Sequence, residues 1–301
     1  MKTLKITFAT IICLVLVACI LSGCGSQKNI YQSFVCDVGD GGGGNVEESD
    51  TVDYWHNLLE KKENMKDLSI NILGVDYKGK YEYSIRWKYN TFTSDVYRDE
   101  SGVEFGVSGK EHKLENVNFM PGNALKDEPY KDEVENIEDK LIPIARDVAS
   151  KFTDDLDKYE VSSHERNTSV YEKDGKEYSI TFYYVTFVRK IQGFDSADYI
   201  EVDITSKGSI ASISFGDPKV SAHNIDTIDK NRIDESVGEL VKKIYNGTKY
   251  ELNGFDIRRQ EVVLTPDNDV CMISRVEVEL TNQAGEEFRT MIEVLTVIDP
   301  A

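Results

Sequence analysis

The strongest constraint on the fold is a stretch of alternating side chains over residues 177–215. Every second residue along 178–184 is a large apolar or aromatic one (Tyr178, Ile180, Phe182 and Tyr184), and two further alternating stretches follow at 199–204 and 210–215. Turns that contain glycine separate them, at Gly193 and Gly208. Because successive side chains of a strand point to opposite faces, a period of two indicates strands, and short glycine turns join them side by side. The stretch therefore predicts an antiparallel meander.

Apolar residues at helical spacing precede each strand-rich region of the chain. They are Val52, Trp55, Leu58 and Leu59; then Val134, Ile137, Leu141, Ile144, Ala145, Val148 and Phe152; then Ile233, Val237, Leu240, Val241, Ile244 and Tyr245. Pro143 marks either a kink in the second helix or its start. We therefore expect an α+β fold of three consecutive units, each a helix plus an antiparallel β-sheet, over residues 51–122, 131–222 and 225–301.

An internal repeat links the first two units. The tetrapeptide Glu-Tyr-Ser-Ile occurs at 82–85 and again at 177–180. Further along, 103–107 matches 200–204, and 114–119 matches 210–215, at a nearly constant offset. A fixed offset of this kind is the signature of a repeated structural unit. We expect the helix-plus-sheet plan to be used twice in full and a third time in shorter form.

The second unit contains Phe187-Val188-Arg189 leading to Gly193, then the strand 200–203, and then Lys207-Gly208-Ser209-Ile210. With these residues it resembles the PepSY-like domains of bacterial envelope proteins. The resemblance covers 131–216 best and 51–120 more faintly, and the sequence departs from the family at 205–207, where an Asp or Asn is usual. Such domains occur as peptidase propeptides and as separate envelope modules. The resemblance implies binding or inhibition of a peptidase.

The first residues resemble a lipoprotein signal peptide. Lys2 and Lys5 precede an uncharged stretch over 8–21, which has the length of a secretion signal rather than of a membrane span. Leu21-Ser22-Gly23-Cys24 then resembles the lipobox of bacterial lipoproteins. We expect 1–23 to be the signal and Cys24 to carry the lipid, which holds the protein on the extracytoplasmic face of the cell membrane.

Residues 24–50 are expected to form a flexible tether. Four consecutive glycines at 41–44 are followed by Glu47, Glu48 and Asp50, and such a segment loses much backbone entropy on ordering. Beyond the signal and Cys24, only Cys36 and Cys271 remain. Two unpaired thiols are the expectation, and one disulfide between them is the alternative.

The charge and the missing motifs exclude several classes of function. A formal net charge of −19 would repel phosphate backbones, so nucleic acid is not an expected partner. The four histidines lie far from one another and from ligand-spaced cysteines, so no metal or other cofactor is expected. The sequence has no nucleophile elbow, phosphate loop or Cys-x-x-Cys pair. We therefore do not expect an enzyme.

Three side chains are candidates for binding a partner. Arg189 is a charge in an apolar strand, and its planar guanidinium suits either a structural pair with Asp203 or a peptide carboxylate. Tyr183 and Trp87 belong to a set of aromatic residues of the kind enriched at interfaces. The leading interpretation is a lipid-anchored module that binds a protein or peptide, possibly a peptidase. The alternatives are an envelope hydrolase with dispersed carboxylates and an acidic cation-binding surface module.

Overall fold

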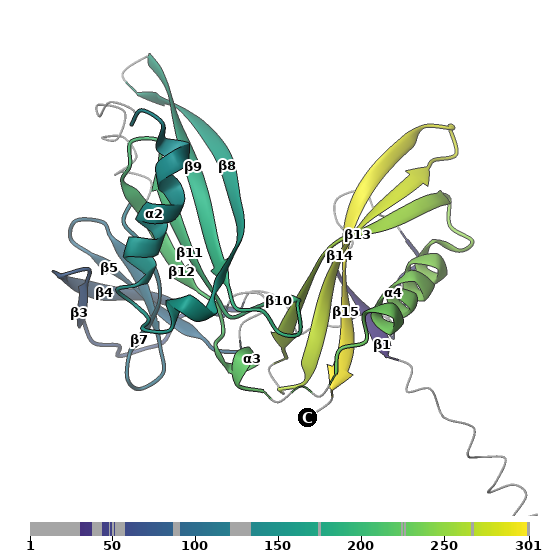
Figure 1. Cartoon of the computed structure of the whole chain (residues 1–301), viewed down its shortest axis with the longest axis horizontal. Helices are drawn as coiled ribbons and strands as arrows, with labels where there is room; N and C mark the ends of the chain where they lie inside the picture. Colours follow the sequence, from purple (N-terminus) through teal and green to yellow (C-terminus); the bar gives the residue numbers. More distant parts are fainter. Residues whose placement is uncertain are drawn as a thin grey trace, which may run out of the picture.

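A computed structural model gives the fold of the chain (Figure 1). It describes residues 31–37, 44–47, 49, 51, 58–86, 91–120, 134–173, 176–223, 225, 227–265 and 268–299. Most of the described residues lie in strands of two sheets, and each sheet is covered on one face by a helix. Among the described residues, no helix combines the length and hydrophobicity needed to cross a bilayer.

The larger sheet has ten strands, and its strands come from both halves of the internal repeat. Its order is β2-β4-β5-β6-β7-β12-β11-β9-β8, with β3 paired to β4. The strands are β2 (Leu58–Glu60), β3 (Leu68–Ile72), β4 (Val75–Arg86), β5 (Ser94–Asp99), β6 (Glu104–Ser108), β7 (Lys113–Asn118), β8 (Glu160–Lys173), β9 (Lys176–Val188), β11 (Tyr199–Thr205) and β12 (Ile210–Phe215). The predicted meander is confirmed, because β9, β11 and β12 are consecutive antiparallel neighbours.

The two halves of the repeat meet at one antiparallel seam. β7 pairs with β12, and Val117 lies opposite Ile213. The repeat also aligns these two residues with each other, since 114–119 matches 210–215. Equivalent strands are therefore paired at equivalent residues. The next strands outward, β6 and β11, are also equivalent in the repeat, so these four strands are related by a local twofold arrangement about the seam. The repeat thus extends one sheet instead of building separate units.

Helix α2 (Ile137–Ala149) covers one face of this sheet and closes its core. Its contacts are with β9 and β11, and the apolar face formed by Leu141, Ala145 and Val148 packs on side chains such as Phe187 and Val202. The helix continues through Pro143, so it does not begin there. A 3₁₀ turn (Leu156–Lys158) follows α2 and leads into β8.

The smaller sheet has five strands in the order β1-β15-β14-β13-β10. Helix α4 (Lys230–Tyr245) packs on it, and the side chain of Asp229 caps the helix by accepting a hydrogen bond from the Arg232 backbone N–H. The strands are β1 (Gln32–Asp37), β10 (Asp195–Ser196), β13 (Glu251–Leu264), β14 (Val270–Thr281) and β15 (Glu287–Asp299). This second core is separate from the first.

Part of the segment that we expected to be a flexible tether is ordered on the smaller sheet. β1 pairs antiparallel with β15, and the hydroxyl of Ser33 lies 2.7 Å from those of Ser236 and Thr296. Further on, the backbone N–H of Asn45 donates to the carbonyl of Ile244 at the end of α4. The glycine-rich composition did not indicate this pairing, because an edge strand draws its backbone partners from a distant part of the chain.

A short segment joins the two sheets (Figure 1). β10 pairs in parallel with β13, and helix α3 (Lys219–Ala222) also contacts β13. Gly216, just before α3, approaches the carbonyl of Ala197 so closely that a Cβ would lie 1.9 Å from that oxygen. β10 lies between β9 and β11 along the chain, and α3 follows β12, so both connections come from the meander and fix the larger sheet against the smaller one.

The predicted fold class is wrong. The described chain is mostly β, with only three helices and two large sheets, rather than three helix-plus-sheet units. The physical reason is the seam between β7 and β12, which merges the strands of the first two expected units into one sheet. In addition, 58–60 of the first expected helix form strand β2, and 52–57 lie outside the described residues.

Candidate functional site

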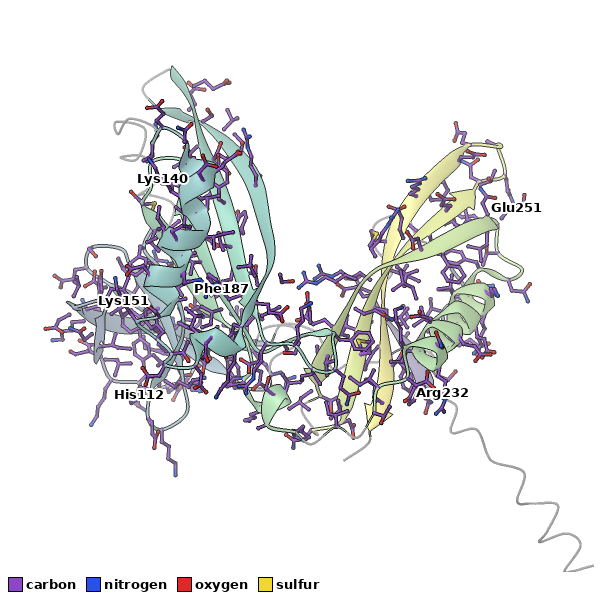
Figure 2. All side chains as sticks on the ribbon, in the orientation of Figure 1. His112, Lys140, Lys151, Phe187, Arg232 and Glu251 are labelled. Carbon is purple, nitrogen blue, oxygen red and sulfur yellow. The ribbon has the colours of Figure 1, made fainter. Side chains whose placement is uncertain are left out.

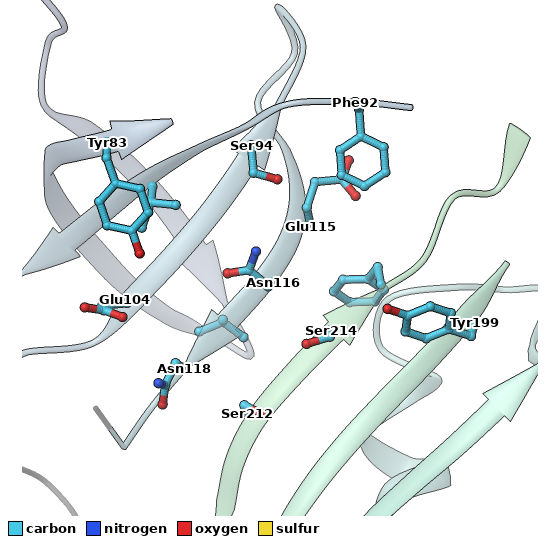
Figure 3. A pocket seen from close by; sticks show the side chains of 13 residues that line it. Tyr83, Phe92, Ser94, Glu104, Glu115, Asn116, Asn118, Tyr199, Ser212 and Ser214 are labelled. Atoms are coloured by element: carbon cyan, nitrogen blue, oxygen red, sulfur yellow. The ribbon is translucent and has the colours of Figure 1, made fainter. Parts of the chain in front are cut away.

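A polar groove of about 480 Å³ lies on the larger sheet, across the seam between β7 and β12 (Figure 3). Its volume is within the usual range of ligand pockets. We call it the central groove, and its lining residues are Tyr83, Phe92, Ser94, Val96, Glu104, Glu115, Asn116, Val117, Asn118, Tyr199, Ser212, Ser214 and Phe215. No lysine, arginine or histidine is among them.

The polar floor of the groove follows from the alternation of the strands. Val117 and Ile213 point into the core under α2, so their neighbours along β7 and β12 point to the opposite face. The register produces two rows of cross-strand neighbours. One row is Glu104, Asn118, Ser212 and Asp203, and the other is Gly106, Asn116, Ser214 and Glu201. The twofold arrangement about the seam exchanges the two rows.

Glu115 enters the groove through a β-bulge. Asn116 pairs with Gly106 and Leu114 with Val107, so Glu115 is the extra residue between them. Its side chain is only 3% exposed. Oε1 accepts a hydrogen bond of 2.5 Å from Ser108 and lies 3.6 Å from Nζ of Lys113. Burial raises the pKa of Glu115, and the hydrogen bond from Ser108 offsets part of that effect.

Asp203 is the second carboxyl of this face whose titration is shifted. Burial raises the pKa of Asp203 to about 6, although the Ser212 hydroxyl donates a hydrogen bond to its Oδ2 and thereby favours the ionised form. The negative charge of Glu201 raises it further. Glu201 itself accepts a hydrogen bond of 2.9 Å from Thr186. The groove face is therefore acidic on both sides of the seam.

Aromatic side chains stand at the ends of the groove. Tyr83 comes from β4, Phe92 from the segment before β5, and Tyr199 from the start of β11 (Figure 3). Burial raises the pKa of both tyrosines, so both hydroxyls are neutral at physiological pH. The ring of Tyr199 lies against Gly216, where a Cβ would approach its ring carbons to 2.5 Å. The groove thus offers apolar ring faces beside its polar floor.

The sequence-predicted binding residues do not meet at this groove. Arg189 follows β9 at the junction between the sheets, and its Nη1 lies 3.9 Å from Oδ2 of Asp198. Asp198 also accepts a hydrogen bond of 2.7 Å from Tyr159. Asp203, the partner that we expected for Arg189, is bonded to Ser212 instead. The arginine therefore belongs to the junction.

Tyr183 is part of the core rather than of a binding surface. It lies opposite Ile204 on the face covered by α2, and its side chain is 7% exposed. The same face holds Phe187, whose ring lies 5.2 Å from the guanidinium carbon of Arg146 of α2 (Figure 2). Trp87 and Cys24 lie outside the described residues. No disulfide joins Cys36 and Cys271, as expected.

The sequence did carry one overlooked signal for the groove. Asn116, Asn118, Ser212 and Ser214 alternate with apolar residues in the two repeats, and they indicate a polar face. A strand that packs on a core normally has one polar face, so this alternation alone does not indicate a groove. It becomes informative only with the pairing of β7 and β12, which places the polar residues side by side. Glu115 gave no such signal, because a bulge breaks the alternation on which the prediction rested.

The alternative functions, hydrolysis and cation binding, each require a specific arrangement of carboxyl groups. A pair of carboxyls that acts as acid and base needs pKa values shifted in opposite directions, whereas those of Glu115 and Asp203 are both raised. Within the described ranges, no group of three or more His, Cys, Asp or Glu side chains is placed to hold a metal ion. The arrangement is therefore best suited to hydrogen bonding and charge recognition.

Comparisons with known proteins give no family. No family model matches the chain, and no curated protein matches it. Among solved structures, a green fluorescent protein from Branchiostoma lanceolatum aligns with a TM-score of 0.12 and 8% identity, over 78% of this chain and 79% of that one. MucB aligns with a TM-score of 0.11 and 10% identity, over 74% and 82%. Both TM-scores are too low to indicate a shared fold.

Proposed function

We propose that the protein is a lipid-anchored, extracytoplasmic binding protein that holds a segment of polypeptide in the central groove. The observation that carries the proposal is the polar floor built by paired strands at the centre of the larger sheet. The side-chain amide of Asn116 offers donors and an acceptor, and that of Asn118, whose Oδ1 accepts from the Met120 backbone N–H, offers further donors; such groups match those of a peptide backbone. The aromatic rings at the groove ends supply apolar contact area.

The anchor in this proposal is Cys24, within the segment that resembles a lipobox. Because β1 begins at Gln32, only seven residues separate the lipidated Cys24 from the smaller sheet. A fully extended chain from Cys24 to Gln32 spans at most about 28 Å. A lipid on Cys24 would therefore hold the smaller sheet close to the membrane, rather than at the end of a long tether.

A groove-filling variant tests the proposal. The full-length chain, immobilised in a mild non-ionic detergent, is incubated with a proteolytic digest of total bacterial protein, and retained peptides are identified by mass spectrometry. Ser214→Trp places an indole across the floor, whereas Lys140→Trp places one on the exposed side of α2 (Figure 2). We expect peptides that the native chain and Lys140→Trp retain and that Ser214→Trp does not. Equal retention by all three chains would contradict the proposal.

A further inference from the structure

We infer that the Glu115 end of the central groove binds a protonated amine of the peptide, and this inference rests on the proposed function. Two observations independent of the net charge support it. Among the described residues, two buried polar atoms at this end have no partner, and the repeat shows that the fold does not need the carboxyl.

Two buried atoms at this end of the groove have unused hydrogen-bonding capacity. Within the described residues, neither Oε2 of Glu115 nor Oγ of Ser94 has a hydrogen-bond partner. Ser94 is fully buried, and it is the cross-strand neighbour of Ser108, the residue that donates to Glu115. A buried polar atom without a partner has lost its hydration without a hydrogen bond to compensate, which destabilises the fold. A ligand that donates to both atoms would remove that destabilisation.

The lining of the groove indicates that the ligand group that donates to these two atoms carries a positive charge. Glu104 and Glu115 both line it, and none of its lining residues within the described part of the chain is basic. Lys113 approaches only Oε1 of Glu115, and the guanidinium of Arg98 is engaged by Glu104 and Glu82. An ammonium group carries three N–H donors and a positive charge, so it can satisfy Oε2 and the Ser94 hydroxyl together.

The ring of Phe92 adds a third contact suited to a cation. Phe92 lines the groove, and Figure 3 shows its ring at the end where Glu115 lies. The face of an aromatic ring attracts a cation within about 6 Å of its centre. A carboxylate, a hydroxyl and an aromatic ring therefore line the same end of the groove.

The internal repeat shows that the fold can be built without this carboxyl. The repeat aligns Glu115 with Ala211, and Ala211 occupies a matching bulge, because Asp203 pairs with Ser212 and Ile204 with Ile210. Ala211 is buried, as Glu115 is. The same backbone irregularity thus accommodates a methyl group in one half and a buried acid in the other. The bulge alone does not explain the acid, whereas recognition of a cation does.

Matched tripeptides test the inference by titration calorimetry on the full-length chain in a mild non-ionic detergent. The probes are Ac-Gly-Lys-Gly-NH2, its uncharged norleucine analogue Ac-Gly-Nle-Gly-NH2, and Gly-Nle-Gly-NH2, whose only amine is the amino terminus. The first and third probes distinguish a side-chain amine from a terminal one. We expect at least one amine-bearing probe to bind about tenfold more tightly than the uncharged analogue.

Substitutions at Glu115 and Ser94 show whether the preference for an amine arises at this end of the groove. Glu115→Ala copies the residue of the equivalent bulge, and Glu115→Gln keeps the shape without the charge; both should remove the preference for the amine. Ser94→Ala should reduce it several-fold. Glu251→Gln, an exposed carboxyl at the start of β13, is the control and should leave it unchanged (Figure 2). Thermal melts of each variant confirm that it is folded.

The two proposals fail in different ways. Equal affinity for charged and uncharged probes, or an amine preference that survives Glu115→Ala in a folded chain, would overturn the cation inference. In that case the proposed binding of a polypeptide segment in the groove would still hold, provided that the native chain retains peptides from the proteolytic digest and Ser214→Trp does not. A selection that returns no such peptides would overturn the proposed function itself.

Discussion

Gly106 and Asn116 lie opposite each other on β6 and β7, and the side chain of Asn116 occupies the space that a Cβ on residue 106 would need. A Cβ built there lies 2.6 Å from Nδ2 of Asn116 and 3.1 Å from its Oδ1. The glycine therefore lets the amide lie across the groove floor. The shape of the groove depends on this residue, although glycine contributes no side chain to the lining.

Gly106→Ala should displace the Asn116 amide and disturb the groove. Overpacking of this kind costs about 1–3 kcal/mol, which denaturant unfolding would measure, and peptide affinity should fall as well. Gly254→Ala in β13 is the matched control, because a Cβ there would meet Glu279 Oε2 at an ordinary 3.7 Å. Equal stability and unchanged affinity in Gly106→Ala would show that the amide is free to move elsewhere.

Asp203→Asn should change how stability depends on pH. Burial raises the pKa of Asp203 to about 6, above the ordinary value of about 3.9. Between these values the folded state holds a proton that the unfolded state has released, so raising the pH through this window removes stability.

The variant stays neutral throughout and keeps an oxygen for the Ser212 hydroxyl. We expect similar unfolding free energies for the two proteins near pH 4, and a variant more stable by about 2 kcal/mol at pH 7. Denaturant titrations at a series of pH values measure the difference between them. Parallel curves across the window would rule out a proton on Asp203 in the folded state.

Tyr183→Ala should mainly reduce stability, whereas Tyr83→Ala should mainly reduce peptide affinity. Tyr183 is buried under α2, so truncation should cost about 3–5 kcal/mol by analogy with other large aromatic residues. Tyr83 is partly exposed in the groove, so its loss should affect peptide affinity more than stability. Chemical unfolding and calorimetric titration of both variants provide the comparison. The reverse pattern would mean that the strand faces are assigned incorrectly.

Cys24→Ala should release the protein from the membrane. Without the thiol, lipid cannot be attached, and the proposed anchor is lost. Membrane fractionation followed by immunoblotting measures the distribution, and Cys36→Ala serves as the control because Cys36 lies in β1. An unchanged membrane fraction in Cys24→Ala would refute the anchor.

Local patterns predicted most of the strands and both long helices, but not how they assemble. Alternation identified the meander of β9, β11 and β12, since the period of a strand is a local property. The pairing of Val117 with Ile213 joins residues from two repeats, and its register is set by tertiary packing. The repeat was visible in the sequence, whereas its use to extend one sheet was not.

The groove could not be predicted from the sequence for the same reason. Its floor exists only because β7 and β12 are neighbours, and Glu115 reaches it through a bulge that no periodic pattern predicts. The aromatic residues were recognised as a set, but the choice of Tyr183 failed because the exposed face depends on register. Arg189 was identified as a charge in an apolar strand, and the structure pairs it with Asp198 at the junction of the sheets.

Site-specific photo-crosslinking in intact bacterial cells tests the central claim most directly. A photoreactive benzoylphenylalanine replaces Ser214 on the groove floor in one strain and Lys140 on the exposed side of α2 in another. The account predicts polypeptide adducts from position 214 that are absent from position 140 and are lost when Glu115 is also changed to Ala. Adducts of equal yield from both positions, or none from position 214, would contradict a groove that holds a polypeptide segment.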